Sequence, residues 1–340
     1  MAQQHLEPTD PTARVTTGDA LAGYLRAQAT EFLRALRLHR ETGTASATEQ
    51  SVDAARALRR SARRISGSLH TFRPLLEANW SEEIRPELAW LSGTLGLEHA
   101  YEARLERLLL ALHRLSGSTS LPNQATSEAV AERGNLTVGA AKAGALLDRQ
   151  LTLARTRAHS TALQALGSSR FHAVADKVAV LASEVPLTAT APATDLRPLA
   201  AAAEERLTDA IAALPLVTAG HPYNAEALVH GLSPDPSPHP QDGPWHQVRL
   251  LLRLHRYARE VLSDRDAPVD VRLLAAGHAL NRHRDASEAA AAAAAAARTP
   301  RIAPATAYAL GVLHADQRHE VEAARFEFQQ AWQKQRVEAV

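Results

Sequence analysis

Residues 245–257 read Trp245-His246-Gln247-Val248-Arg249-Leu250-Leu251-Leu252-Arg253-Leu254-His255-Arg256-Tyr257, with no glycine or proline. At roughly 100° per residue, a helix places His246, Arg249, Arg253 and Arg256 on one stripe about 80° wide. Most of the remaining circumference is apolar, which is typical of a helix buried in its domain. Unpaired arginines would cost several kcal/mol each in such a place. The stripe must therefore face carboxylates, a water-filled cleft or a bound polyanion.

The composition around this stretch favours packed helices. Hydrophobic residues make up 45% of the 340 residues but aromatic residues only 4%, and alanine supplies much of the difference. The 38 basic and 37 acidic residues give a net charge of +1. Overall charge therefore gives no argument for nucleic acid or a membrane surface, and an electrostatic function requires charges that are sorted locally.

The sequence also bears on the compartment. There is no cysteine, which fits a reducing environment, and the first residues lack the apolar core of a signal peptide. The longest apolar run, the alanines of residues 289–297, is too short to span a bilayer. We expect a cytoplasmic protein with no membrane partner.

Helical periodicity recurs along the chain, and no segment alternates as a strand would. We expect an all-α fold with a flexible tail over residues 1–18, an N-terminal helical half over 19–185, a linker over 186–194 rich in Thr, Ala and Pro, and a C-terminal helical half over 195–336. The helices are expected at about 19–40, 51–77, 81–115, 127–166, 170–183, 195–214, 245–263, 269–298 and 304–336.

The basic stripe has a counterpart in the first half. Arg56, Arg59 and Arg63 repeat the spacing of His246, Arg249 and Arg253, and each pair of positions is separated by 190 residues. Spacing i, i+3, i+7 places three groups on one helix face. The chain is thus interpreted as two related halves, each a bundle of about four helices with one cationic helix. If the halves pack about a pseudo-twofold axis, the two basic faces converge on one cavity.

These residues resemble the signatures of the CHAD family, the conserved histidine α-helical domain. Ala55-Arg56-Ala57-Leu58-Arg59-Arg60-Ser61-Ala62-Arg63-Arg64-Ile65, followed by Leu69-His70-Thr71-Phe72-Arg73-Pro74-Leu75-Leu76, is similar to the first signature. Residues 245–260 resemble the second, and residues 280–286 resemble its L-G-E-H-R-D-A turn. The resemblance extends over about residues 19–336.

Membership in the family implies two four-helix bundles around a basic channel that binds inorganic polyphosphate. The polyphosphate-binding residues that the resemblance and the repeat indicate are Arg56, Arg59, Arg63, Arg64, His246, Arg249, Arg253 and Arg256. Guanidinium groups suit such a ligand because they form bidentate, charge-assisted hydrogen bonds to phosphate oxygens. The resemblance therefore also predicts a location at polyphosphate granules.

The chain departs from the family pattern at several basic positions. Arg56 stands where the first signature has its histidine, and Leu250 and Leu254 stand where the second has basic residues. The alternative function is therefore a granule-associated or scaffold protein that keeps the fold with weakened anion binding. The basic residues also have structural alternatives. His246 and the arginines near it could form a network with internal carboxylates such as Glu260 or Asp285, and residues 56–64 could form a solvated face.

Other classes of function find little support. No nucleophile, phosphate-loop or zinc-protease pattern occurs, so we expect a protein that is not an enzyme and needs no cofactor. His278 and His283 are five residues apart, as are His314 and His319, whereas helical chelation of a metal favours four. General nucleic-acid binding is disfavoured because aromatic residues for stacking are scarce. Protein partners are not indicated.

Overall fold

The computed structural model describes residues 17–42, 49–117, 127–221, 239–263 and 270–333, and these contain helices and no β-strand. The all-α prediction is therefore confirmed. The predicted tail falls almost wholly outside the described residues, as do residues 334–336 of the last predicted helix. The main helices are α1 (Gly18–Thr42), α2 (Glu49–Thr71), α3 (Ala78–Gly117), α4 (Ser127–Leu166), α5 (Ser169–Ser183), α6 (Arg197–Ala212), α9 (Gly243–Leu262), α10 (Val271–Ala297) and α11 (Pro304–Gln333).

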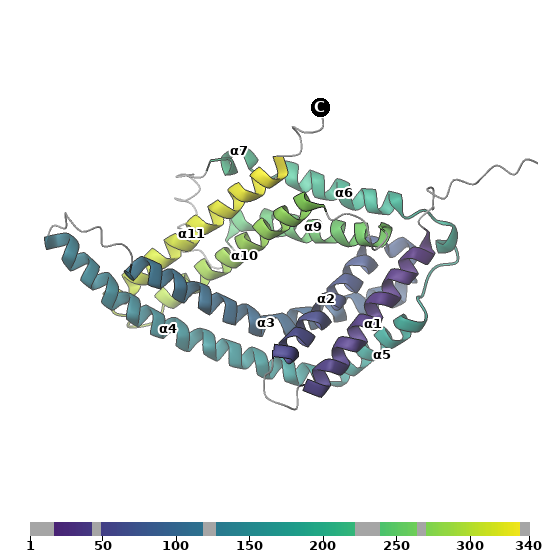
Figure 1. Cartoon of the computed structure of the whole chain (residues 1–340), viewed down its shortest axis with the longest axis horizontal. Helices are drawn as coiled ribbons and strands as arrows, with labels where there is room; N and C mark the ends of the chain where they lie inside the picture. Colours follow the sequence, from purple (N-terminus) through teal and green to yellow (C-terminus); the bar gives the residue numbers. More distant parts are fainter. Residues whose placement is uncertain (1–16, 43–48, 118–126, 222–238, 264–269, 334–340) are drawn as a thin grey trace, which may run out of the picture.

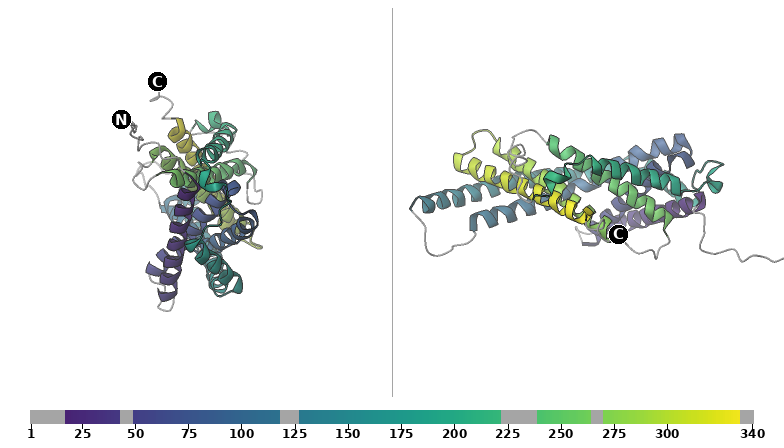
Figure 2. Two further views of the ribbon diagram at one scale, coloured as in Figure 1. Left: turned by 90° about the vertical axis from the view of Figure 1, so that its right-hand side faces the viewer. Right: turned by 90° about the horizontal axis from the view of Figure 1, so that it is seen from above.

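The helices form an elongated molecule (Figures 1 and 2). In Figure 1, α3 and α4 run along the lower edge, α10 and α11 lie at the upper left, and α1 and α2 cross the right-hand side. The short helix α7 (Leu216–Ala219) follows α6. None of the described helices combines the length and the apolar character that a bilayer crossing would require.

The apolar core is divided into three clusters. The first joins α1, α2, α5 and the start of α3, with Phe32 and Phe72 fully buried. The second joins α3 and α4 to α10 and α11, around Leu108 and Leu310. The third joins α6, α9, α10 and α11 around Trp245. Because the second cluster draws helices from both halves of the sequence, the described core does not divide into one bundle for each half.

The second helix is shorter than its periodicity predicts. It ends at Thr71, and a 3-10 turn, η1 (Arg73–Leu75), follows with Pro74 in its first positions. Proline has no backbone N–H to continue an α-helix and disfavours helical geometry in the residue before it. The predicted extension to Glu77 is therefore wrong, and the chain turns toward α3 six residues earlier than expected.

The segment 186–194, predicted as a linker, is packed against the first half. Thr188 N donates to Leu75 O at 2.9 Å and Glu77 N donates to Pro186 O at 3.0 Å. Ala191 is fully buried, in the 3-10 turn η2 (Ala191–Ala193). These contacts fix where α6 begins, and α6 in turn packs against α9.

Candidate functional site

Helix α9 carries the basic stripe on one side and a core-facing surface on the other. Trp245, Val248 and Leu252 are buried in the third cluster, and Ala258 and Val261 reach the first. His246, Arg249, Arg253 and Arg256 are half-buried. The burial of the apolar side therefore fixes which way the basic stripe faces, as the periodicity predicts.

The basic helix of the first half lies against this stripe. Helices α2 and α9 pack together, and at their crossing a Cβ atom on Gly67 would lie 2.6 Å from the ring of Tyr257. No side chain other than hydrogen fits there without a shift, so Gly67 allows the two backbones to approach closely. The approach brings Arg59 and Arg63 of α2 within electrostatic range of Arg253 on α9.

A fifth arginine joins this group from α10. The charge of Arg284 acts on Arg59 and Arg63 of α2. It also acts on Arg249 and Arg253 of α9 and on His246. We call the five residues the arginine cluster: Arg59, Arg63, Arg249, Arg253 and Arg284. The basic repeat of the sequence does not indicate Arg284, although the H-R-D-A turn that contains it could have done so.

Burial and mutual repulsion lower the pKa values of arginines in the cluster. Burial, followed by the charges of Arg59 and Arg253, lowers the pKa of Arg63 to about 10. Burial, followed by the charges of Arg284 and Arg253, lowers the pKa of Arg249 to about 9. Desolvation and neighbouring like charges both disfavour the protonated form of a base. The positively charged forms of these arginines are therefore less favourable in the folded protein than they are in water.

Neutral groups hold two of the guanidinium groups. Arg59 Nε donates to the backbone oxygen of Ser92 at 3.0 Å, and Arg249 Nε donates to Asn281 Oδ1 at 2.8 Å. The guanidinium of Arg59 also lies over Gly96, where an added Cβ would be only 2.3 Å away. Neutral acceptors orient a guanidinium without cancelling its charge, and both side chains keep further N–H donors. Two buried nitrogens, Arg63 Nε and His246 Nε2, have no hydrogen-bond partner among the described residues.

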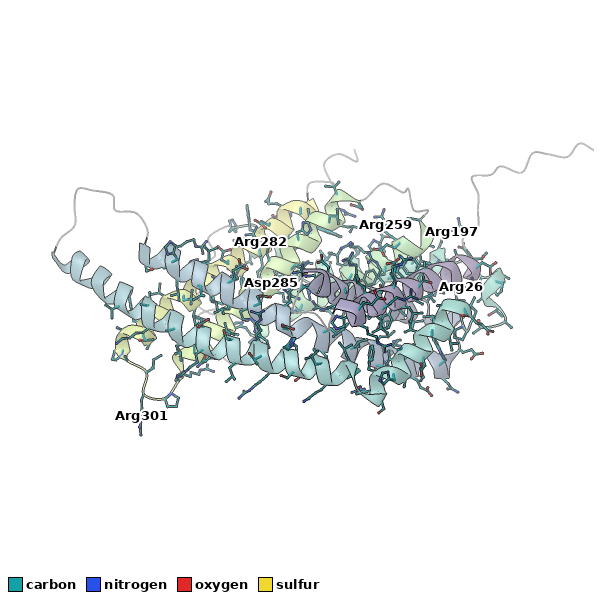
Figure 3. All side chains as sticks on the ribbon, turned by 60° about the horizontal axis from the view of Figure 1, so that its bottom comes forward. Arg26, Arg197, Arg259, Arg282, Asp285 and Arg301 are labelled. Atoms are coloured by element: carbon teal, nitrogen blue, oxygen red, sulfur yellow. The ribbon has the colours of Figure 1, made fainter. Side chains whose placement is uncertain are left out.

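Two acidic side chains lie beside the arginine cluster, and both already have partners. Arg284 Nε donates to Asp285 Oδ1 at 2.8 Å. Glu288 accepts a hydrogen bond from Arg104 of α3. Asp285 is partly exposed, and Figure 3 shows Arg301 farther away, where it points outward at the turn between α10 and α11. These carboxylates therefore pair with Arg284, whereas the other four arginines of the cluster form no ion pair with a described acidic residue.

His246 lies at one end of the arginine cluster, above a buried polar network. Its ring meets the ring of His283 edge-on, with 5.5 Å between centroids. Burial lowers the pKa of His246, and Asp242 opposes this while Arg249 adds to it. Asp242, which directly precedes α9, is fully buried and accepts hydrogen bonds from Arg318 and Arg325 of α11. This network anchors the start of α9 on α11.

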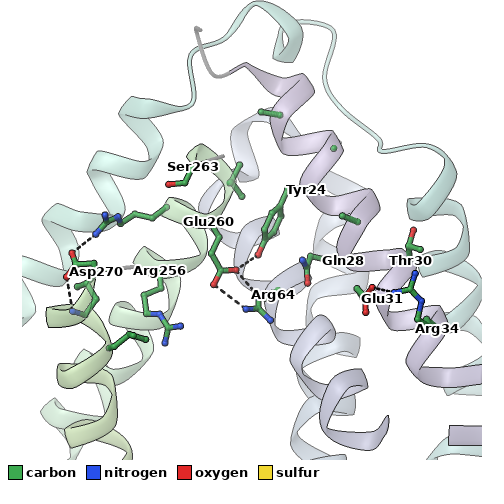
Figure 4. A pocket seen from close by; sticks show the side chains of 17 residues that line it. Tyr24, Gln28, Thr30, Glu31, Arg34, Arg64, Arg256, Glu260, Ser263 and Asp270 are labelled. Atoms are coloured by element: carbon green, nitrogen blue, oxygen red, sulfur yellow. Dashed lines mark hydrogen bonds and ion pairs between the residues drawn. The ribbon is translucent and has the colours of Figure 1, made fainter. Parts of the chain in front are cut away.

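The three remaining predicted residues are not part of the arginine cluster. Arg56 is exposed and pairs with Asp53 at 3.4 Å. Arg64 pairs with Glu260, a carboxylate that the sequence offers as a partner for the arginines of α9 and not for those of residues 56–64. Arg256 lines a pocket of about 840 Å³ between α1, α9 and the start of α10, with Arg64 and Glu260 (Figure 4). Of the eight predicted residues, the structure brings together Arg59, Arg63, Arg249 and Arg253, with His246 beside them.

Comparisons with known proteins agree with the sequence signatures. The sequence model of the CHAD domain matches residues 27–270. The matched range contains α2 and α9 but ends before α10, so Arg284 lies outside it. The chain is 74% identical to a protein of known structure, PptA from Streptomyces chartreusis, over 93% of this chain and 99% of that one, with a TM-score of 0.78. No curated protein matches the chain.

Proposed function

The chain belongs to the CHAD family, and from this premise we propose that it binds inorganic polyphosphate at the arginine cluster, without catalysis. The observation that carries the proposal is the convergence of cations from α2, α9 and α10, in which Arg59 and Arg249 have neutral hydrogen-bond partners and Arg284 alone of the five is paired with an acid among the described residues. A phosphate chain supplies the negative charge that these groups lack. It also accepts the bidentate hydrogen bonds that guanidinium groups donate.

The repeating charge of the ligand suits the arrangement of the site. The groups His246, Arg249, Arg253 and Arg256 follow α9 at helical spacing, so the stripe is about 15 Å long. A linear polyanion that binds along a row of cations releases counterions from each neutralised phosphate. The location that follows from this ligand is the polyphosphate granule.

Nucleic acid fits the same site less well. Tyr257, an aromatic residue within electrostatic range of Arg63 and Arg253, is buried against Gly67, with the guanidinium of Arg64 over its ring at 5.9 Å. Sequence-independent binding of single strands depends on aromatic rings that are free to stack on bases. We therefore propose that the ligand is a phosphate chain without bases.

Calorimetric titration with long-chain polyphosphate at about 0.15 M salt tests the proposal. We expect saturable binding that Arg249→Glu and Arg253→Glu each weaken by about tenfold or more. Arg26→Glu is the matched control, because Arg26 is exposed on α1 and undergoes the same change of charge. Absence of binding to the wild-type protein, even at low salt, contradicts the proposal.

A second candidate is a scaffold that keeps the fold with weak anion affinity. The observation in its favour is that Arg56 and Arg64 are already paired with acids. The same titration separates the two candidates. A scaffold would bind polyphosphate no better at the arginine cluster than on its exposed surface, so the cluster variants and Arg26→Glu would behave alike.

A further inference from the structure

The pocket between α1, α9 and α10 contains a carboxylate in the position of a ligand. Arg64 Nε donates to Glu260 Oε2 at 2.8 Å, and Arg64 Nη2 donates to Oε1 at 3.3 Å (Figure 4). This two-pronged arrangement is the one that a guanidinium group forms with a phosphate. Tyr24 of α1 donates a third hydrogen bond, from its hydroxyl to Glu260 Oε2 at 2.8 Å. Glu260 thus occupies the anion-binding edge of Arg64.

The pair lies where a phosphate chain could reach it. Arg64 directly follows Arg63 of the arginine cluster in α2, and Glu260 lies one turn beyond Arg256 on α9. The side chains of Arg64 and Glu260 are 25% and 29% exposed, so neither is sealed in the core. Arg256 lines the same pocket and makes no ion pair with a described residue. Arg256 connects the pocket to the arginine cluster, because it lines the pocket and its charge acts on Arg253.

Most of the other charges on the pocket wall cancel in pairs. Arg259 pairs with Asp270 at 2.6 Å, and Arg34 pairs with Glu31 on α1. Arg34 and Glu31 are both exposed residues of α1, so their pairing does not involve a residue next to the arginine cluster. Glu260 differs because its partner comes from the cationic helix of the other half.

We propose that Glu260 is an internal anion that keeps Arg64 out of the binding array and so sets the extent of the phosphate chain that the protein holds. The inference rests on the proposed function and adds a specificity-determining residue to it. With Glu260 in place, the array ends at Arg253 and Arg256. When residue 260 is neutral, Arg64 can donate its two hydrogen bonds to a phosphate. The row of cations that binds the phosphate chain then gains Arg64 and loses the competing negative charge of Glu260.

A double-mutant cycle of Glu260→Gln and Arg64→Gln, titrated with long-chain polyphosphate, tests this directly. We expect Glu260→Gln to tighten binding by about three- to tenfold. In the Arg64→Gln background, the gain should fall to that of Glu31→Gln, which removes the same charge from the same pocket wall. Arg64→Gln alone should weaken binding by about twofold or less, because Arg64 is not free in the wild-type protein.

Tyr24→Phe is a second variant that tests whether any change in binding comes only from a defect in folding. It removes one hydrogen bond from Glu260 but leaves both charges, so it should tighten binding in the same direction by a smaller factor. Thermal melting of each variant checks that the protein is folded. Weaker or unchanged binding in both folded variants overturns the inference, and so does a gain that persists without Arg64. If the wild-type protein binds while the cycle shows no coupling, the inference alone fails; if it does not bind, the proposed function fails with it.

Discussion

Arg63 of α2 and Arg253 of α9 lie near enough that the charge of Arg253 lowers the pKa of Arg63, although 190 residues separate them in the chain. The two are equivalent positions of the internal repeat. Their proximity joins the cationic helices of both halves in a single site. Like charges held together in this way destabilise the free protein, and a bound anion relieves the repulsion.

The first prediction concerns the stability of the free protein. Arg253→Met should raise the free energy of unfolding by about 1 kcal/mol or more, because it removes a half-buried cation without an acid partner and keeps the aliphatic volume. Urea denaturation without polyphosphate measures this. The same variant should bind polyphosphate more weakly. A destabilised Arg253→Met would indicate that this arginine is part of a satisfied structural network.

The second prediction concerns stabilisation by anions. Sulfate or phosphate should raise the melting temperature more than chloride at equal ionic strength, since a ligand that binds only the folded protein stabilises it by mass action. Polyphosphate at about a hundred times its dissociation constant should add about 2.7 kcal/mol. Thermal melting of the wild type beside Arg249→Gln measures the difference. Equal shifts in both proteins would contradict anion binding at the arginine cluster.

The third prediction concerns alkaline pH. Because the pKa values of Arg249 and Arg63 are lowered to about 9 and about 10, these groups lose their protons in the folded protein before they do so in the unfolded chain. The free protein should therefore gain stability from these two groups as the pH rises above about 9. Polyphosphate binding, which needs both charges, should weaken over the same range. Polyphosphate titrations at several pH values measure this loss of affinity. In the control Arg249→Gln, the part of the loss that begins near pH 9 should be absent.

The fourth prediction uses two glycines of α3. A Cβ at residue 96 would lie 2.3 Å from the guanidinium of Arg59, whereas a Cβ at residue 93 would meet nothing within 4 Å. Gly93→Ala should therefore stabilise the protein by about 0.5–1 kcal/mol without changing affinity. Gly96→Ala should displace Arg59 and weaken polyphosphate binding by about three- to tenfold. Equal affinities of the two variants would show that the position of Arg59 does not matter for binding.

The sequence predicts the helices well because the pattern of apolar residues is local. The spacing of Leu and Ile along α2 and the Pro-rich approach to α9 are enough to locate both helices and the faces they bury. The same spacing predicts the end of α2 too late, because apolar residues continue at helical spacing past Pro74 while the helix itself stops before it. The three-cluster core could not be predicted, since the side chains of α3 and α4 do not reveal that they pack against α10 and α11.

The site was harder to predict than the fold because its charges depend on contacts across the chain. Periodicity places Arg63 and Arg64 equally well on a basic helix. It does not reveal that Arg64 meets Glu260, which lies 196 residues away. Nor does it reveal that Arg284, on a third helix, completes the arginine cluster. Which arginines are neutralised is thus a property of the packed structure, and no local pattern encodes it.

The affinity of Arg63→Glu for polyphosphate, compared with that of Arg60→Glu, tests the convergence of the two halves most directly. Both substitutions change the charge of α2 equally, but Arg60 is exposed and Arg63 faces α9. We expect Arg63→Glu to weaken binding by about tenfold or more and Arg60→Glu by about twofold or less. Equal losses, or no loss from Arg63→Glu, would show that the first half does not share a phosphate site with the second.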